Sequence, residues 1–323
     1  MRVLRSRVPA GFVLARLGVT VLLLCGVTVV VFVLMEAAPR DAATQFLGVK
    51  ATPERLAELR SELGVDRPSW LRYLEWAGGV VSGDFGASLA SGRPIGELVA
   101  APAGRTAVLA GIAFLGVLVI GVVGGIRAGY RASGRVDRAL STAALIGLSM
   151  PEFVIGIGLI AVFALWLRML PAVSLIPSSG QLSDRPEILV LPAVTLAVVA
   201  GSYVLRLVRG IVAAGTARPD VEAARLDGIG PARVLFAHVL PSAVGPIVTA
   251  VVAVVPYLVG GAVVVEQLFG YPGLGRLLIT AVDGRDQPLV MAIVLLLSAV
   301  TVLGYAAADV LARVADPYRR RHS

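Results

Sequence analysis

The sequence predicts an all-α membrane protein with six transmembrane helices. Of its 323 residues, 57% are hydrophobic and only 15% are charged, and the mean hydropathy is +0.86. Six apolar runs are each long enough, at about 20 residues, to cross a bilayer as a helix. Arginine is concentrated in alternate segments between these runs, which is typical of cytoplasmic loops.

Residues with special chemistry are few. The formal net charge is +8 and comes almost wholly from arginine, because Lys50 is the only lysine. A soluble chain this basic would suggest nucleic acid, but the membrane pattern explains the charge better. Cys25 has no second cysteine, and His238 and His322 lie far apart. These counts exclude an intrachain disulfide and a zinc site, whereas a site made of carboxylates alone stays open.

The chain is expected to start with a cytoplasmic tail, 1–10, which contains Arg2, Arg5 and Arg7. Residues 11–35 form the first predicted span. This apolar run is longer than the core of a secretory signal peptide, which is about 7–15 residues, so we expect it to be retained.

Residues 36–105 form the predicted extracytoplasmic loop region, with eight basic and nine acidic residues. Thr52-Pro53 predicts a helix start, because a capping hydroxyl precedes a proline at the first helical position. The stretch from Pro68 to Val81 places three aromatic residues three positions apart: Trp70, Tyr73 and Trp76. This spacing fits a helix at the membrane interface and equally a small packed core.

The transmembrane core is expected over 106–314, beginning with a second span from Thr106 to Ala128. Small residues let membrane helices approach one another closely. This span contains several that we expect at a contact between helices: Gly111, Gly116, Gly121, Gly124 and Gly125.

The third apolar run, from Asp137 to about Arg168, contains Pro151, which should kink or break the helix. Glu152 follows it directly. Because a carboxylate inside a membrane is costly, Pro151 and Glu152 are candidates for a translocation path. Two structural roles for Glu152 stay open beside this one. Its carboxylate could pair with the backbone that Pro151 frees, or lie near the interface because the helix begins later.

Three further spans are expected at about 188–212, 243–265 and 288–312, with a polar loop at 266–287 and a cytoplasmic tail at 315–323. Arginine is distributed unevenly between the two sides: there are four in 1–16, four in 127–138, five in 206–238 and four in 313–323, but two each in 168–187 and 266–287. This asymmetry predicts that both termini are cytoplasmic.

The stretch from Asp220 to Pro241 is a polar insert before the fifth span. Asp220 is expected to cap a short helix that starts at Val221. Gly228 fits the left-handed position that ends this helix, and Gly230-Pro231 fits the start of a second helix, which Leu240-Pro241 would close. The insert could dock a partner, stand free in solvent or pack only on its own bundle. A DNA-type helix-turn-helix is disfavoured by the flanking spans.

This insert resembles the EAA loop of ABC importer permeases, whose pattern is E-A-A-x3-G-x9-I-x-L-P. The matching residues are Glu222, Ala223, Ala224, Gly228, Leu240 and Pro241, and His238 stands where the pattern has isoleucine. The resemblance implies a type I ABC importer permease fold in which the loop, 213–241, carries a cytoplasmic coupling helix. It also implies that the six matching residues couple the chain to ATPase subunits.

Two other stretches narrow the resemblance. The sequences GLSMPEF at 147–153 and FGYPGLGR at 269–276 resemble the dipeptide, oligopeptide and nickel permease subfamily. The long loop after the first span, with TPE at 52–54 and GDFG at 83–86, resembles its B-type subunit. An extracytoplasmic loop motif is expected at Pro272, Gly273 and Gly275.

The family implies a permease subunit of an ATP-driven, binding-protein-dependent importer for di- or oligopeptides or a related small solute. Its expected partners are a homologous second permease subunit, two ATPase subunits that bind ATP and magnesium, an extracytoplasmic substrate-binding protein and membrane lipid, but no nucleic acid. We expect a multi-pass protein of a bacterial-type cell membrane. The chain itself is expected to be no enzyme and to hold no metal or cofactor. It has no Gly-Lys-Ser/Thr phosphate-binding loop, because Ala51 follows Lys50.

The alternative function is a stand-alone secondary transporter or channel, in which Glu152 and the broken third span would serve an ion gradient. No inverted repeat is evident in the sequence to support it. A membrane-embedded enzyme is disfavoured, because the spans contain no cluster of His, Cys or paired carboxylates. The solute stays open among peptides of different length, nickel, glutathione and opine-like compounds.

Overall fold

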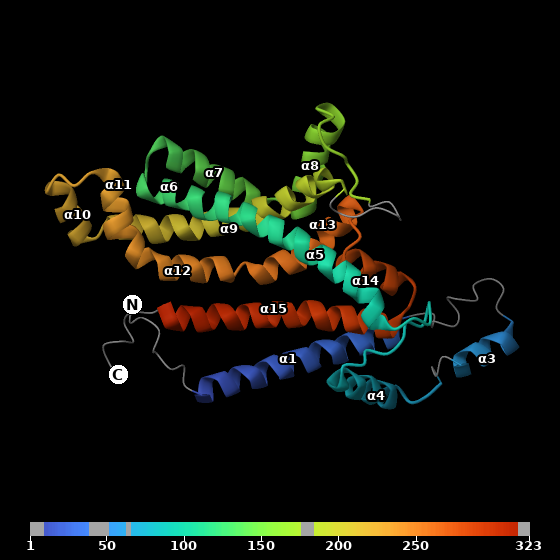
Figure 1. Ribbon diagram of the computed structural model, residues 1–323. Coiled ribbons are helices and arrows are strands. Elements are labelled where there is room, and N and C mark those ends of the chain that lie inside the picture. The colour runs from blue at the N-terminus through green and yellow to red at the C-terminus, as the bar shows by residue number, and fades with distance from the viewer. Residues whose placement is uncertain (1–9, 39–51, 63–65, 176–183, 316–323) are drawn as a thin grey trace. The chain divides into compact units, whose positions relative to one another are not determined.

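The chain forms helices, apart from one isolated bridge between Ala87 and Pro94 in the part that the structure describes. The computed structural model describes residues 10–38, 52–62, 66–175 and 184–315, so the expected terminal tails lie almost entirely outside the described residues. Figure 1 shows the helices. They are α1 (Ala10–Ala37), α3 (Pro53–Glu62), α4 (Ser69–Ser82), α5 (Ile95–Val117), η2 (Leu118–Val123), α6 (Gly124–Tyr130), α7 (Arg135–Ser149), α8 (Glu152–Leu159), η3 (Ile160–Trp166), η5 (Pro186–Leu189), α9 (Val190–Thr216), α10 (Pro219–Leu226), α11 (Pro231–Val234), η6 (Leu235–Val239), α12 (Leu240–Val252), α13 (Val255–Phe269), α14 (Leu274–Asp283) and α15 (Gln287–Ala315).

Six candidate spans are present when one broken pair is counted as a single span. Five helical stretches are long and apolar enough to cross a membrane: Leu14–Ala37, Ile95–Tyr130, Pro186–Thr216, Pro231–Phe269 and Gln287–Leu311. The helices Arg135–Ser149 and Glu152–Trp166 meet at 109° and make up the sixth. The predicted all-α membrane class is confirmed, and the break falls at Pro151, where proline removes a helical hydrogen bond.

Two boundaries differ from those expected. Helix α5 begins at Ile95 rather than Thr106, so the last residues of the predicted 36–105 loop are helical. The charged residues Glu97 and Arg105 favoured the prediction of a loop for residues 95–105. Glu97 lies instead in the first helical turn, where the helix dipole favours a carboxylate. Helix α14 lies inside the predicted 266–287 loop. The helical spacing of its apolar residues indicates a helix, but the polar residues around them favoured the prediction of a loop.

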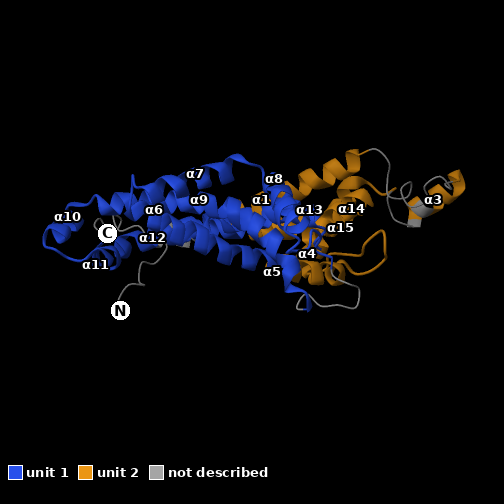
Figure 2. Cartoon of the chain, turned by 90° about the horizontal axis from the view of Figure 1, so that it is seen from above, with its two compact units in different colours: residues 1–16, 108–271, 301–323 blue, residues 17–107, 272–300 orange. Residues whose placement is uncertain are grey.

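The chain divides into two compact units (Figure 2). Unit 1 comprises residues 1–16, 108–271 and 301–323, and unit 2 comprises 17–107 and 272–300. In unit 1 the central element is α9, against which η2, α6, α7, α8, α12 and α13 pack. Its buried residues run along most of its length, from Leu191 to Gly215. Neighbours that pack this closely on a membrane helix are expected to contact it with small residues.

Glycines of the second span provide that contact. A Cβ added at Gly116 would lie 2.6 Å from the Cβ of Ala197, and one added at Gly121 would lie 2.7 Å from the Cβ of Val204. Gly124 and Gly125 approach α9 similarly, so four of the five expected positions are confirmed. Gly111 is the exception, because a Cβ there meets no atom within 4 Å.

This contrast predicts opposite effects of one substitution. A Cβ on Gly125 would lie 2.8 Å from the carbonyl oxygen of Leu205, which is backbone and cannot rotate away. Gly125→Ala is therefore expected to destabilise the chain by about 1–3 kcal/mol, as overpacking does. Gly111→Ala, the matched control, should be neutral or stabilising by up to about 1 kcal/mol, since alanine favours helices. Thermal unfolding of the purified chain in detergent measures both, and equal effects would contradict the assigned contact.

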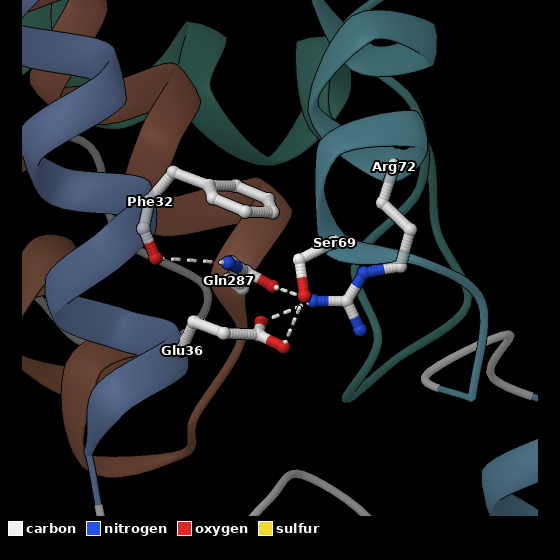
Figure 3. Close-up of polar contacts among 5 residues, drawn as sticks. All are labelled: Phe32, Glu36, Ser69, Arg72 and Gln287. Carbon is white, nitrogen blue, oxygen red and sulfur yellow. Dashed lines mark hydrogen bonds and ion pairs between the residues drawn. The ribbon is translucent and has the colours of Figure 1, made fainter.

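Unit 2 is held by a polar cluster at the ends of α1, α4 and α15 (Figure 3). The carboxylate of Glu36 accepts a hydrogen bond of 2.9 Å from the hydroxyl of Ser69. It also forms an ion pair with the guanidinium of Arg72. Arg72 also donates to the side-chain oxygen of Gln287 at 3.3 Å, and its guanidinium lies 5.7 Å from the ring centroid of Phe32. These contacts join the start of the last span to the end of the first span and to α4, in the region that follows the first span.

A second connection in unit 2 is made by Asp286, which is buried just before α15. Its carboxylate accepts hydrogen bonds from the hydroxyl of Ser88 at 2.5 Å and from the backbone N–H of Leu89 at 3.1 Å. It also caps α15, because the N–H of Leu289 donates to it at 3.4 Å. One carboxylate thus fixes the 88–90 turn against a helix start.

The structure shows the packed alternative for two of the three aromatic residues of α4. Tyr73 packs edge-on against Phe32 of α1, with ring centroids 5.5 Å apart, and its ring centroid is 6.2 Å from that of Trp76. These two rings belong to a small packed cluster. Trp70 is instead 65% exposed, as a ring at an interface would be. The predicted start of α3 is confirmed, because Pro53 is its first residue and the hydroxyl of Thr52 accepts from the N–H of Arg55.

Candidate functional site

Helix α10 carries the first part of the Glu222–Pro241 motif. The helix starts at Pro219, whose fixed φ and missing N–H suit the first helical position. The expected cap by Asp220 is therefore wrong, because Asp220 lies inside the first turn. Its carboxylate is paired with the guanidinium of Arg218, at 3.0 and 2.8 Å.

Gly228 ends α10 as predicted, with φ at +76° in the left-handed region. The N–H of Gly228 donates to the carbonyl of Arg225 at 3.0 Å, and the N–H of Ile229 donates to that of Ala224 at 3.1 Å. Together these two bonds make a Schellman turn, which satisfies carbonyls that the helix end leaves without partners. The turn reverses the chain within two residues.

The second helix starts at Pro231, with Gly230 before it, as predicted. Its expected end at Leu240-Pro241 is wrong. The chain stays helical from α11 through the π-helix η6 into α12, where Pro241 occupies one of the first two positions. A π-helical turn absorbs the hydrogen-bond mismatch that an interior proline creates, so Pro241 does not end the helix. The loop is therefore joined rigidly to the fifth span.

The motif divides into an exposed side and a buried side. Val221 and Ala224 are buried against unit 1, whereas Glu222, Ala223, Gly228 and Pro241 are exposed. Leu226 is 80% exposed at the end of α10, and Phe236 in η6 is 68% exposed. Exposed large apolar residues beside a charged helix are typical of a surface that binds another protein.

Three contacts, whose residues the sequence did not suggest, hold this loop on the spans. The hydroxyl of Tyr130, at the end of α6, donates to the carbonyl of Pro231 at 2.6 Å. The guanidinium of Arg218 donates to the hydroxyl of Ser242 at 2.7 Å. A Cβ on Gly215 would lie 3.0 Å from a methyl group of Val239, so α9 and η6 touch there. His238, which departs from the family pattern, is partly buried in the same η6.

An ion pair between the buried Asp137 and the partly exposed Arg209 joins α7 to α9 in unit 1. The carboxylate of Asp137 receives two hydrogen bonds from the guanidinium of Arg209, at 2.5 and 2.7 Å. It also accepts from the backbone N–H of Ser133 and from the hydroxyl of Ser141. A buried carboxylate with this many donors fixes the orientation of the two helices, because moving either would leave charge unpaired.

Glu152 is the first residue of α8, which follows the helix α7 after the break at Pro151. Its carboxylate accepts a hydrogen bond of 2.5 Å from the hydroxyl of Tyr257 in α13. A Cβ on Gly261, one turn further along α13, would lie 3.4 Å from that carboxylate. Within the described residues the side chain of Glu152 bonds to Tyr257 rather than to the backbone that Pro151 frees.

The expected loop motif lies in unit 2, at the start of α14. Gly273 precedes the first helical residue, Leu274, whose N–H donates to the hydroxyl of Thr106 at 2.8 Å. The carbonyl of Pro272 accepts from Arg105 at 3.4 Å, and Gly275 is buried. These residues shape a turn between helices. They belong to unit 2, whereas Glu222, Gly228 and Glu152 belong to unit 1.

No metal site is assembled within the described ranges, where no group of three or more His, Cys, Asp or Glu is suitably placed. The side chains of the EAA loop and of the α8 start contribute hydrogen bonds, ion pairs and apolar contacts.

Comparisons with known proteins identify the family. Residues 121–321 match the family described as "Binding-protein-dependent transport system inner membrane component", and residues 10–94 match its N-terminal component. The "Probable peptide ABC transporter permease protein y4tP" of Sinorhizobium fredii is 34% identical over 95% of this chain and 98% of its own. The "Oligopeptide transport system permease protein AppB" of Bacillus subtilis is 32% identical over the same shares.

Solved structures agree with the fold. The MetNI methionine ABC transporter, in an inward-facing form, is similar with a TM-score of 0.55 over 68% of this chain and 96% of that one, at 19% identity. The family match and the relatives above favour the main prediction over a stand-alone secondary transporter. The chain belongs to the binding-protein-dependent transport system inner membrane components, as a multi-pass permease of the ABC importer type.

Proposed function

We propose that this chain forms half of the translocation path of an ATP-driven, binding-protein-dependent importer for di- or oligopeptides or a related small solute. One observation carries the proposal: the first part of the Glu222–Pro241 motif lies on a short helix, α10, that has an exposed outer side, and the loop around it is fixed to the spans. Peptide is favoured as the solute because the relatives that match 95% of the chain are named peptide permeases.

The exposed side of α10 is proposed as the docking surface for an ATPase subunit. Glu222 and Ala223 would face a groove of that subunit, since Ala223 is small and permits close approach. Leu226 and Phe236 would be covered by the same partner. Ala224, Gly228, Leu240 and Pro241 would act differently, by shaping the loop. This division follows from burial, because Ala224 is only 5% exposed and lies beyond the reach of a partner.

Movement of α10 would pass to the spans through two contacts. The bond between Arg218 and Ser242 joins α10 to α12, and the bond between Tyr130 and Pro231 joins α6 to α11. ATP and magnesium would bind to two separate ATPase subunits. Their closure would draw the coupling helices of this chain and of a homologous second permease subunit together and open the path outward. Hydrolysis would reset it.

The sidedness proposed here follows the arginine distribution. The tails 1–10 and 315–323 and the EAA loop, 213–241, would be cytoplasmic, and the 36–105 region would be extracytoplasmic. The turn with Pro272, Gly273 and Gly275 would then lie on the outer side, where a substrate-binding protein delivers the solute. Pro151 and Glu152, together with Tyr257, would line part of the path within the core, 106–314.

Uptake of labelled solute into proteoliposomes tests the proposal. The complete importer is compared with the same importer lacking its ATPase subunits, with ATP supplied and the proton gradient collapsed by an ionophore. We expect uptake that requires both ATP and the ATPase subunits and survives loss of the gradient. A dipeptide, a longer peptide, nickel and glutathione are compared in parallel to identify the solute. Uptake that persists without any ATPase subunit would contradict the proposal.

A further inference from the structure

A pocket of about 230 Å³ lies in unit 1 beside the base of the EAA loop. Its walls come from the last turn of α6, the start of α7 and the π-helix η6. The lining residues are Ile126, Arg127, Tyr130, Arg131, Val136 and Leu235. Two of its six residues are therefore cationic, and the others present apolar or aromatic surface.

The two arginines of this pocket lack a carboxylate partner. Nearby Arg209, Arg218 and Arg225 are each paired with an acidic residue. In contrast, no ion pair or side-chain hydrogen bond joins Arg127 or Arg131 to any residue within the described part of the chain. Two guanidinium groups that line one pocket repel one another, so an anion between them would be stabilising.

The location of the pocket indicates where that anion comes from. Arg127 lies near the end of the apolar span Ile95–Tyr130, and Arg131 follows that end directly. Val119 and Val123 precede Arg127 at intervals of four residues and are 65% and 55% exposed. Val119 and Val123 lie in the π-helix η2, whose hydrogen bonds span five residues, so an interval of four is close to one turn and keeps these exposed side chains on one side. An apolar strip therefore leads along the span to two guanidinium groups at its end.

We infer that this pocket binds the headgroup of an anionic phospholipid. The planar guanidinium groups of Arg127 and Arg131 would donate paired hydrogen bonds to the phosphate oxygens. An acyl chain would lie along Val119 and Val123. Free phosphate shares the charge but not the chain, and the apolar strip favours the lipid. Basic pockets between spans on the cytoplasmic side are suited to acidic lipid headgroups.

Occupancy of the pocket would bear on the EAA loop. The ring of Tyr130 forms one wall, its hydroxyl donates to Pro231, and the guanidinium of Arg225 lies 6.0 Å from its centroid. Leu235 forms another wall and belongs to η6, which leads directly into the fifth span. A bound lipid would therefore fill the space between the end of the second span and the base of the loop.

Native mass spectrometry of the full chain, titrated with phosphatidylglycerol in detergent, tests this inference. We assign about fivefold of the affinity to each of the two pocket arginines, the usual contribution of one basic residue to binding of acidic lipid, because only these two would reach the phosphate. We therefore expect Arg127→Gln/Arg131→Gln to weaken phosphatidylglycerol binding about 25-fold, and Arg127→Lys/Arg131→Lys to retain most of it. The matched control is Arg135→Gln/Arg138→Gln, which removes the same charge from exposed positions outside the pocket. It should change the affinity less than about twofold.

Further arms of the titration distinguish lipid binding from a net-charge effect and from binding of free phosphate. Phosphatidylcholine should bind to the wild-type pocket far more weakly, and inorganic phosphate at millimolar concentration should not displace phosphatidylglycerol. Equal losses in the pocket and control variants would overturn the inference, because the effect would then reflect net charge alone. Unchanged lipid binding in the pocket variant, or displacement by inorganic phosphate, would overturn it as well. Lipid binding retained by Arg127→Lys/Arg131→Lys would show that substitution at these two positions leaves the pocket folded.

Discussion

Replacing Gly228 with valine is expected to uncouple the ATPase subunits from the spans while the chain still inserts in the membrane. A Cβ on Gly228 meets no atom within 4 Å, so the substitution acts only through the backbone, where φ is +76°. This conformation costs an L-residue about 1–2 kcal/mol, and a β-branched residue tolerates it poorly. Opening the turn at the end of α10 would relieve the strain and misplace Glu222 and Ala223.

A cost of this size reduces the population with a correctly placed α10 about 5–30-fold. Co-purification of the ATPase subunits and ATP-driven uptake should both fall accordingly. The matched control is Gly230→Ala, two residues further along, where a Cβ also meets no atom within 4 Å but φ is −62°. We expect that variant to behave like wild type. Normal coupling in Gly228→Val, or an equal defect in both variants, would count against the role given to the turn.

The sequence predicted the loop where backbone chemistry is local. The left-handed end at Gly228 and the helix start at Pro231 depend on one or two residues each, and both predictions are confirmed. The predicted cap at Asp220 is wrong because the helix starts at Pro219, two residues before the expected Val221. A proline at the first helical position removes an N–H that would have no partner, which makes it the better start signal in this segment.

The end of the second helix could not be predicted, because it depends on a π-helical turn. Nothing in the amino-acid sequence from Leu235 to Val239 distinguishes a π-helix from an α-helix. The turn lets the helix continue past Pro241, and the choice is made by packing of Val234 and Val239 in the buried interior of unit 1. Tertiary contacts of this kind have no signature in periodicity.

Pairs that are distant in the sequence were also beyond prediction. The close approach of the second span to α9 was expected from its glycines, but Gly111 has the same composition signal and no neighbour. Tyr257 lies 105 positions from Glu152, and no spacing rule connects them. Arg218 and Tyr130 were ordinary loop residues in the sequence, and only the structure shows that they hold the loop. The sequence thus identified individual residues of the candidate sites. The residues that contact them were visible only in the structure.

The pair of Glu152 and Tyr257 carries the other large expected effect. The carboxylate accepts the tyrosine hydroxyl at 2.5 Å, which holds it at the start of α8 beside the small Gly261. A carboxylate has about four acceptor positions, so beside the bond from Tyr257 it would accept a charge-assisted hydrogen bond from the ammonium group of a peptide terminus. Within the proposed importer, Glu152→Gln should lower uptake of a free peptide at subsaturating concentration roughly tenfold to a hundredfold, the range for a hydrogen bond to a charged group.

Tyr257→Phe should have a smaller effect in the same direction, because it removes the bond that orients the carboxylate and leaves the charge in place. The two losses should not add in the double variant, since both act through one group. Glu187→Gln is the control: it removes one carboxylate at an exposed ion pair with Arg185 and should leave uptake unchanged. The decisive comparison is a peptide acetylated at its N-terminus, for which Glu152→Gln and wild type should transport alike. Equal losses for free and acetylated peptides would show that Glu152 does not meet the ammonium group.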